Sequence, residues 1–73
     1  MKSDDEYLKK LGEYISKLRK SKGYSQDRLY LEAEFSRGTM SKIENGLVNP
    51  QLLTLRKIAK TLKISIKLLM IEE

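Results

Sequence analysis

Cysteine and histidine are both absent from this chain of 73 residues. Without cysteine no disulfide framework can form, and without either residue the chain lacks the usual zinc ligands and the commonest general base. Catalysis would then need a carboxylate pair or a lysine in a pocket, and the acidic residues are expected at helix ends or in one ion pair. The composition argues against an enzyme, and we expect no metal, cofactor or small-molecule ligand.

Long hydrophobic runs are absent as well. No apolar stretch approaches the roughly 20 residues that a membrane span requires, and the first residues, MKSDDEYLKK, lack the hydrophobic region of a secretory signal. Together with the missing cysteines, this predicts a cytoplasmic protein with no membrane partner. A chain of this length should form one small domain, residues 1–73, stabilised by helix packing or by dimerisation.

Positive charge is in excess, with 15 Lys and Arg against 10 Asp and Glu and a formal net charge of +5. Such a balance favours polyanions such as nucleic acid, although many small basic proteins bind none. Asp4, Asp5 and Glu6 lie near the start of the chain, and Glu72 and Glu73 lie at its end. The basic residues of the middle are Lys17, Arg19, Lys20, Lys22, Arg28, Arg37 and Lys42. We therefore expect the basic part of the chain to coincide with a segment that reads nucleic acid.

Two helical patterns joined by a turn occupy residues 26–45, QDRLYLEAEFSRGTMSKIEN. Leu29 and Ala33 lie one helical turn apart in the first pattern. Met40 and Ile43 do the same in the second, so each helix has a narrow apolar stripe that can face the other. The opposite side of the second helix carries Ser36, Arg37, Gly38, Ser41 and Lys42. Such a helix, with little bulk and some positive charge, suits the major groove of DNA better than a hydrophobic core.

Serine residues stand where helices are expected to begin. A serine hydroxyl at a helix N-cap accepts a hydrogen bond from an otherwise unpaired backbone N–H. The first serine is followed three residues later by Glu6, which completes a capping-box pattern. The expected N-caps are Ser3, Ser25, Ser36 and, for a last helix over about 65–72, Ser65.

Glycine and proline mark other boundaries. The first helix should end before Gly23 and the third at Gly46, where glycine can take the left-handed conformation. Gly12, inside the first helix, is expected to be tolerated instead of marking a close approach by a neighbour. Pro50 fits the first position of a fourth helix. Its expected buried face consists of Leu52, Leu55, Ile58, Ala59 and Leu62. The predicted fold class is an all-α bundle of five short helices.

Three stretches of the sequence together resemble the Cro/repressor-type helix-turn-helix family, also called the xenobiotic-response-element (XRE) family. They read LRKSKGYSQDRL, FSRGTMSKIENG and NPQLLTLRKIAKTL, in the order and spacing of that family. The resemblance covers roughly Leu11 to Met70. It implies a five-helix bundle of the lambda-repressor-like type, and it makes residues 36–45 the recognition helix for double-stranded DNA.

The resemblance also implies roles for single residues. The DNA base-reading residues are then Ser36, Arg37, Gly38, Ser41 and Lys42. The phosphate-binding residues that we expect are Gln26, Thr39, Asn45 and Lys22. Arg37 could contact a guanine through two hydrogen bonds or grip a phosphate, and Asn45 could instead be a polar partner of the Gly46 turn. Arg19 and Glu44 match a structural ion pair that ties the recognition helix to the first helix.

Three residues depart from the family pattern. Tyr30 replaces a small residue in the second helix, so we expect its ring to project outward or Gly38 to make room for it. Glu34 replaces the turn glycine and should accept a left-handed conformation at a cost of order 1 kcal/mol. Gly38 itself replaces a residue that is commonly serine-like. These departures affect local geometry and leave the predicted fold unchanged.

The last predicted helix bears on oligomeric state. Ile66, Leu69 and Met70 are expected to complete the core, which leaves Leu68 and Ile71 without a partner in a monomer. Exposed apolar side chains suggest an interface, so we expect a homodimer. A two-fold dimer would bind a palindromic site with half-sites about 34 Å apart.

The leading functional hypothesis is therefore a sequence-specific transcriptional regulator that binds a palindromic operator as a homodimer. Its size is similar to that of restriction-modification controllers, phage repressors and promoter-binding antitoxins, and the sequence does not choose among them. An antitoxin or protein-interaction module with secondary DNA binding is an alternative. A nonspecific nucleic-acid binder is another, and the shaped recognition helix argues against it.

Overall fold

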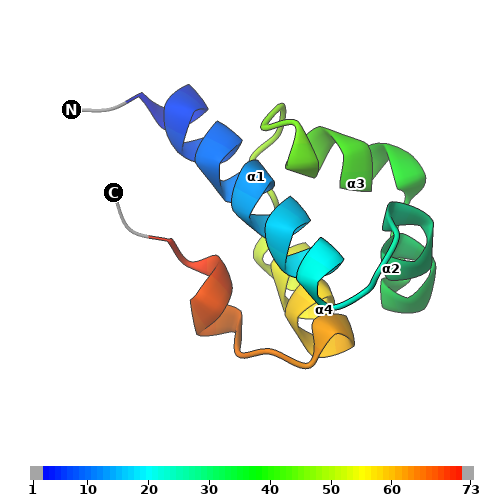
Figure 1. Cartoon of the computed structure of the whole chain (residues 1–73). Coiled ribbons are helices and arrows are strands. Elements are labelled where there is room, and N and C mark those ends of the chain that lie inside the picture. Colours follow the sequence, from blue (N-terminus) through cyan, green and yellow to red (C-terminus); the bar gives the residue numbers. More distant parts are fainter. Residues whose placement is uncertain (1–2, 72–73) are drawn as a thin grey trace.

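Four α-helices and one short 3-10 helix follow one another along the chain (Figure 1). The computed structural model describes residues 3–71. The elements are α1 (Asp4–Ser21), α2 (Gln26–Ala33), α3 (Arg37–Glu44), α4 (Leu52–Leu62) and the 3-10 helix η1 (Ile66–Leu69). The all-α fold class is confirmed, since residues 3–71 contain no strand. None of these helices is long and apolar enough to cross a membrane.

Each helix start that was assigned to a serine is confirmed. The Oγ of Ser3 accepts a hydrogen bond from Glu6 N at 3.2 Å, and the Oγ of Ser25 accepts one from Arg28 N at 3.1 Å. Ser36 caps α3 in the same way through Thr39 N at 3.1 Å. Ser65 caps η1. Local side-chain chemistry therefore fixes where four of the five elements begin.

The turns between helices rely on left-handed residues. Glu34 closes α2 with φ 62° and ψ 51°, as the departure from the family pattern predicted. Gly46 follows α3 with φ 71°, which is also as predicted. Lys63 closes α4 with φ 58°, and no sequence signal indicated this turn. A left-handed non-glycine residue costs of order 1–2 kcal/mol, which the packing around the two turns must offset.

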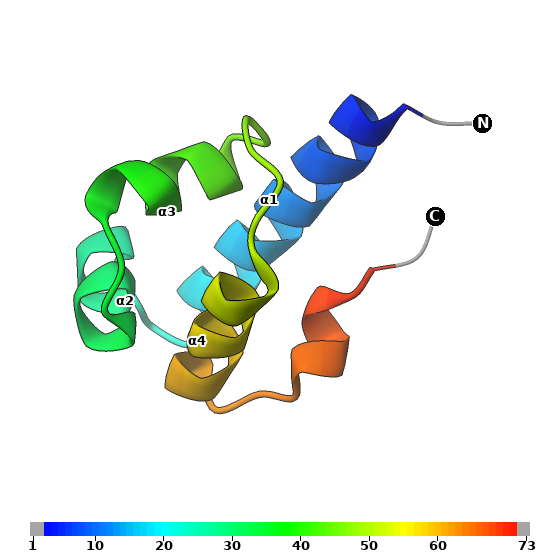
Figure 2. The ribbon, with the colours of Figure 1, turned by 180° about the vertical axis from the view of Figure 1, so that it is seen from behind.

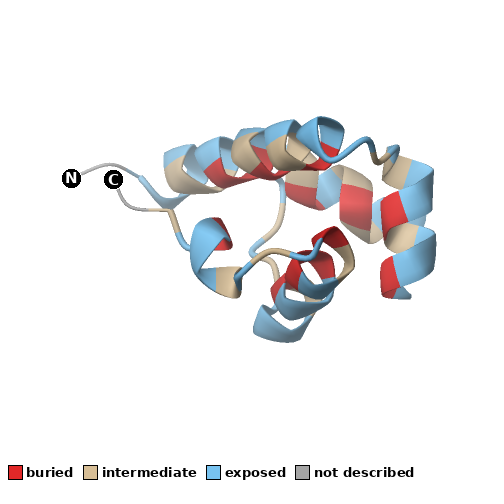
Figure 3. Ribbon diagram, turned by 60° about the horizontal axis from the view of Figure 1, so that its bottom comes forward, coloured by how far each residue is buried: buried red, intermediate tan, exposed pale blue. Residues whose placement is uncertain are grey.

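Every element contributes to one hydrophobic core. Ile15 of α1, Leu29 of α2, Met40 of α3 and Ile58 of α4 are each 0% exposed, and Leu69 of η1 is 1% exposed. Figure 3 shows the buried stretches of all the helices turned toward one another. Both ribbon views place α2 and α3 at one end of the molecule and η1 at the other (Figures 1 and 2). The core therefore supports α3 from behind and leaves its outer face open.

The prediction that α4 begins at Pro50 is wrong. The helix begins at Leu52, and Gln51 is its N-cap with extended backbone angles and no side-chain cap bond. Proline fixes φ near −65°, a value that suits an extended segment as well as a first helical turn. Leu52, predicted to be buried, is 63% exposed because it lies in the first turn of α4, beyond the edge of the core.

The fifth predicted helix is shorter than expected. It is the 3-10 helix η1, whose C-cap is Met70 with φ −96° and ψ 73°, and residue 72 of the expected range lies outside the described residues. Leu69 is buried as predicted, but Met70 is 55% exposed because a 3-10 turn rotates successive side chains by more than an α-turn does. Ile71 packs half-buried against the core, and its carbonyl oxygen accepts a hydrogen bond from the Tyr7 hydroxyl at 2.8 Å. The expectation that Ile71 lacks a partner within the chain is therefore wrong.

Gly12 marks a close approach, which contradicts the expectation that it is merely tolerated. A Cβ atom at this position would lie 2.5 Å from the carbonyl oxygen of Ile43 and 2.6 Å from that of Glu44. Both of these atoms belong to the last turn of α3. The absent side chain therefore lets the backbones of α1 and α3 pack directly against each other.

Gly38 does not make room for Tyr30. A Cβ atom at Gly38 would have no atom within 4 Å, so the residue faces open space. Tyr30 does not project fully outward either, because it is half-buried and packs against the core. Both proposed accommodations are wrong, since a tyrosine can cover the edge of a core with its ring while its hydroxyl stays near water.

Candidate nucleic-acid interface

Helices α2 and α3 form the two-helix unit predicted for residues 26–45. Leu29 and Ala33 of α2 are buried, as are Met40 and Ile43 of α3. The apolar stripes therefore face inward as predicted. With these stripes buried, the opposite side of α3 is left as an outer surface.

Two cationic side chains on this outer surface make no contact that stabilises the described part of the fold. Arg37 and Lys42 are both exposed, and neither forms an ion pair or a side-chain hydrogen bond with any residue from 3 to 71. Gly38 lies beside Arg37 and adds no bulk. An arginine at a helix start is slightly unfavourable against the helix dipole, so a solvated Arg37 contributes nothing to the fold. The surface can therefore approach a ligand without breaking any internal contact.

Ser36 and Thr39 are tied to each other at the start of α3. The Ser36 Oγ accepts a hydrogen bond from Thr39 N and donates one to Thr39 Oγ1 at 2.7 Å. The hydroxyl proton of Ser36 is thus used inside the protein. Thr39 is half-buried and keeps its own hydroxyl proton for another acceptor.

The end of α3 holds a second polar pair. Asn45 is exposed, and its Nδ2 donates a hydrogen bond to Ser41 Oγ at 3.4 Å. Behind this pair, Gly46 presses on α1, because a Cβ atom there would lie 2.7 Å from Lys9 Cα. The turn after α3 is therefore held in place by backbone packing, which leaves the Asn45 side chain at the surface.

A buried ion pair joins α1 to the end of α3. Arg19 Nε lies 2.7 Å from Glu44 Oε2, and Arg19 Nη2 donates to Glu44 Oε1 at 3.0 Å, with side chains only 8% and 6% exposed. Arg19 Nη1 also donates to the Tyr24 carbonyl oxygen at 2.8 Å. The ion pair predicted from the family resemblance is present and has bidentate geometry.

Gln26 joins this ion pair, a contact that sequence reasoning missed. Its Nε2 donates a hydrogen bond to Glu44 Oε1 at 2.8 Å. Arg19, Gln26 and Glu44 all line a groove of about 440 Å³ on the surface of the molecule. Its other lining residues are Glu13, Ser16, Lys17, Lys20 and Asn45. Lys22 lies at the end of α1, at the start of the loop that leads to Gln26, and is exposed.

A second groove, of about 320 Å³, runs along the other edge of α3. Thr39 and Lys42 contribute to it from α3, and Asn49, Gln51 and Thr54 contribute from the following loop and helix. These last three polar residues were not predicted from the sequence. Their alternation with apolar residues such as Val48 was the signal that could have indicated a polar rim.

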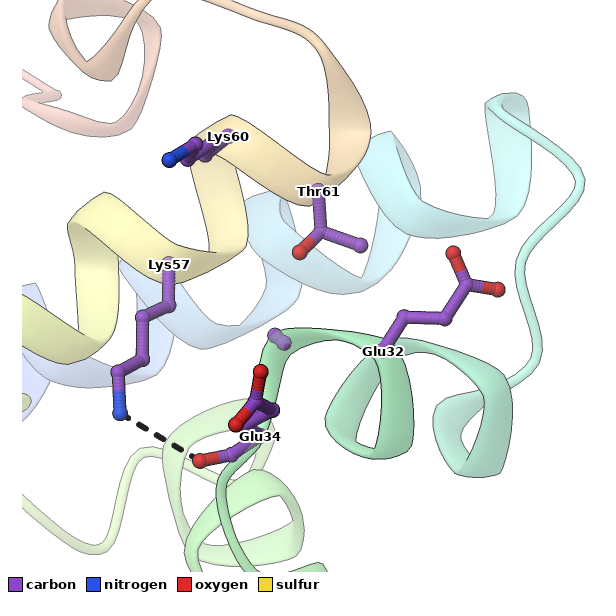
Figure 4. A pocket seen from close by; sticks show the side chains of 6 residues that line it. Glu32, Glu34, Lys57, Lys60 and Thr61 are labelled. Atoms are coloured by element: carbon purple, nitrogen blue, oxygen red, sulfur yellow. Dashed lines mark hydrogen bonds between the residues drawn. The ribbon is translucent and has the colours of Figure 1, made fainter.

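A further pocket lies between the end of α2 and α4 (Figure 4). Its volume is about 350 Å³, and α3 contributes no residue to it. Figure 4 shows Glu32 and Glu34 on one side and Lys57 and Lys60 on the other, with Lys57 Nζ donating to the Glu34 carbonyl oxygen at 3.4 Å. Because the pocket carries both signs of charge, it is a poor site for a polyanion.

An exposed ion pair on α2 contrasts with the buried one. Arg28 Nε lies 2.7 Å from Glu32 Oε2, with side chains 54% and 47% exposed. The hydrogen bond that Arg28 donates to Glu32 raises the pKa of Arg28, and the guanidinium carbon lies 4.0 Å from the centre of the Tyr24 ring. A solvated pair of this kind contributes little to stability.

The positive charge is less concentrated than expected. Residues 45–71 contain no acidic residue but carry Arg56, Lys57, Lys60, Lys63 and Lys67, all exposed. The basic part of the chain therefore extends beyond the two-helix unit onto α4 and η1. The expectation that the basic residues coincide with the segment that reads nucleic acid therefore holds for residues 17–42 but not for the basic residues of α4 and η1.

The chain is similar to known proteins in sequence and in structure. The helix-turn-helix family model matches residues 15–69. The chain is 39% identical over 57 residues to the HTH-type transcriptional regulator SlrR of Bacillus subtilis. The matched segment covers 77% of this chain but only 38% of SlrR. The chain is also 33% identical over 57 residues to the uncharacterised HTH-type transcriptional regulator y4dJ of Sinorhizobium fredii, covering 78% of this chain and 74% of y4dJ.

A solved structure is also similar. The restriction-modification controller protein C.AhdI from Aeromonas hydrophila superposes with a TM-score of 0.82 at 32% sequence identity. The match covers 85% of this chain and 94% of that protein. The likeness therefore extends over nearly the whole of both folds.

Proposed function

The chain belongs to the Cro/repressor-type helix-turn-helix family of DNA-binding transcriptional regulators, and we propose that it binds a palindromic operator as a homodimer. The observation that carries the proposal is the outer face of α3. Arg37 and Lys42 are exposed there with no hydrogen-bond or ion-pair partner for their side chains among residues 3–71, over a unit whose inner face is buried. This is the arrangement that reading the major groove requires. A protein that binds an operator in this way would act in the cytoplasm.

In this proposal α3 enters the major groove and its outer residues read base edges. Arg37 is the principal reader, because its fork matches the two acceptors of guanine and its side chain is free to turn toward them. Lys42 adds a contact of looser geometry. The short residues beside them, Ser36, Gly38 and Ser41, let the helix approach the bases closely.

Residues around the recognition helix bind the phosphate backbone. Gln26 opens α2, where the free backbone N–H groups of a helix start attract anions. Thr39 keeps a hydroxyl donor, and Lys22 and Asn45 are exposed polar residues. Contacts to phosphate set the register of the protein and carry no sequence information.

The proposed dimer uses the apolar surface around η1. Leu68 is 48% exposed, and Leu52 and Met70 are 63% and 55% exposed. Leu52 and Met70 line an apolar groove of about 220 Å³ together with Tyr7, Leu8, Leu11, Asn49, Pro50, Leu55 and Leu69. Ile71, included in the predicted interface, contributes only the part of its side chain that the core leaves uncovered. A patch of this kind on a small domain favours self-association.

Selection of bound duplexes from a random DNA pool tests the proposal. Salt of about 150 mM suppresses weak binding through phosphate alone. We expect a palindromic motif with half-sites about one helical turn, roughly 34 Å, apart. Sedimentation of the protein with and without the selected duplex then measures the stoichiometry. An absence of any enriched motif from folded protein would contradict the proposal.

A protein-interaction module is the second candidate. Leu31, Leu47 and Leu53 are 66%, 70% and 63% exposed and lie outside the proposed dimer surface. Leu53 lines a groove of about 260 Å³ with Arg56, Lys57 and Lys60, which suits an acidic segment of a partner protein. Folded protein that selects no DNA motif would favour this candidate.

A further inference from the structure

We propose that Glu44 is a positioning residue for DNA binding, because it holds the side chain of Gln26 in the orientation that meets a phosphate. The inference rests on the proposed function and adds to it a residue that does not itself touch DNA. The carboxylate of Glu44, in α3, contacts Arg19 of α1 and Gln26 of α2 and so joins the three helices. The ion pair of Arg19 and Glu44 then has a role in recognition as well as in the fold.

The geometry at Glu44 is fixed from both sides. Oε2 accepts from Arg19 Nε at 2.7 Å, and Oε1 accepts from Arg19 Nη2 at 3.0 Å and from Gln26 Nε2 at 2.8 Å. The carboxylate side chain is 6% exposed. A buried group with this many partners has one position, so it is a rigid reference for the Gln26 amide.

The chemistry of the carboxylate determines how the amide points. A carboxylate only accepts hydrogen bonds, so the nitrogen of the Gln26 amide must face Glu44 and its oxygen must face away. The nitrogen carries two N–H donors, and one of them remains free. Phosphate oxygens only accept as well, so the second N–H of the same nitrogen is the group that a DNA backbone would use. By accepting one N–H of Gln26, Glu44 therefore leaves the second N–H of the amide available to a phosphate at the surface groove of the protein.

Preorganisation is the benefit of this contact. A glutamine side chain loses considerable rotamer freedom when it is fixed by a ligand. In this protein Glu44 has already restricted that freedom before DNA arrives. Arg19 offsets the negative charge of Glu44, and Lys17 and Lys20 line the same groove, so the carboxylate does not repel an incoming phosphate despite the presence of Glu13.

The test is a double-mutant cycle on the duplex obtained by selection. Glu44→Asp keeps the charge opposite Arg19 but draws the carboxylate back by one methylene, so that it no longer reaches Gln26. We expect Gln26→Ala to weaken binding about tenfold, since it removes a hydrogen bond to a charged group. Glu44→Asp should weaken binding several-fold in the wild-type background and by less than about twofold in the Gln26→Ala background.

The matched control is Glu32→Asp, which shortens the carboxylate of the exposed Arg28 pair by the same methylene. We expect this variant to bind the duplex as the wild type does. Circular dichroism checks that each variant is folded. An equal loss from Glu44→Asp in both Gln26 backgrounds would overturn the inference, because a purely structural role predicts that result.

A measurement on the wild-type protein avoids any loss of folding. The side-chain amides of Gln26 and Gln51 can be compared by NMR, because Gln51 is exposed and makes no side-chain cap bond. One amide proton of Gln26 should exchange with solvent at least about tenfold more slowly than those of Gln51. Equal exchange of the two glutamines would refute the positioning of Gln26. A protected Gln26 in a protein that selects no operator would instead refute the proposed function alone.

Discussion

Replacing Gly12 by alanine should separate α1 from α3. The new Cβ atom would lie 2.5 Å from the Ile43 carbonyl oxygen and 2.6 Å from the Glu44 carbonyl oxygen. These distances are well inside the optimal separation of about 3.5 Å between nonbonded atoms. Both oxygens belong to backbone within a helix, so neither can rotate away as a side chain would. The helices must move apart, and the buried contacts between them weaken.

The magnitude follows from two opposing effects. Overpacking in a core typically costs about 1–3 kcal/mol, and more where the obstructing atoms cannot yield. Alanine favours a helix interior by about 1 kcal/mol over glycine. We expect the free energy of unfolding to fall by about 2 kcal/mol. For a domain of this size that lowers the melting temperature by about 8–16 °C.

Gly38→Ala is the matched control, since a Cβ atom there would meet nothing within 4 Å. Its free energy of unfolding should stay the same or rise by up to about 1 kcal/mol. Thermal melting followed by circular dichroism measures both variants. If Gly12→Ala melts at or above the wild-type temperature, the close approach of α1 and α3 does not constrain the fold and the reasoning is wrong.

Four other substitutions test the remaining parts of the structure. Glu44→Ala should lower the free energy of unfolding by about 3–5 kcal/mol, because Arg19 is left buried without its countercharge; an unchanged melting temperature with weakened DNA binding would contradict this. Arg37→Ala should relax base preference at one operator position and cost about 1–3 kcal/mol of discrimination. Gln26→Ala should instead weaken binding to all sequences alike. Competition with duplex variants measures both effects. Leu68→Lys should shift the proposed dimer toward monomer in sedimentation while leaving the helix content intact, and a dimer of unchanged stability would place the interface elsewhere.

Features set by neighbouring residues were predicted well from the sequence. The N-cap serines depend on side-chain and backbone chemistry within a few positions, so the pattern alone indicated them. The left-handed Glu34 was predicted from the family resemblance, because it stands at the position of the turn glycine. Pro50 was misassigned because its φ suits two local structures, and the position of the core decided between them. The length of η1 depends in the same way on packing against other helices.

Long-range contacts explain the larger errors. Gly12 is costly in an isolated helix, and the compensating approach comes from Ile43 and Glu44, about thirty residues further along the chain. The contact between Gln26 and Glu44 is likewise invisible to helical periodicity. The resemblance to a known family supplied the Arg19 pair, but it treated that pair and the phosphate contact as separate features.

The freedom of the outer face of α3 has an evolutionary consequence. Arg37, Gly38 and Lys42 take no part in the core or in ion pairing among the described residues, so the stability of the domain hardly depends on their identity. Substitutions at these positions should therefore pass selection for folding and be filtered only by the DNA that they recognise. A lineage of such proteins can acquire new operators one residue at a time while the scaffold stays the same. The same property makes these positions suitable for a randomised library from which regulators of chosen specificity are isolated.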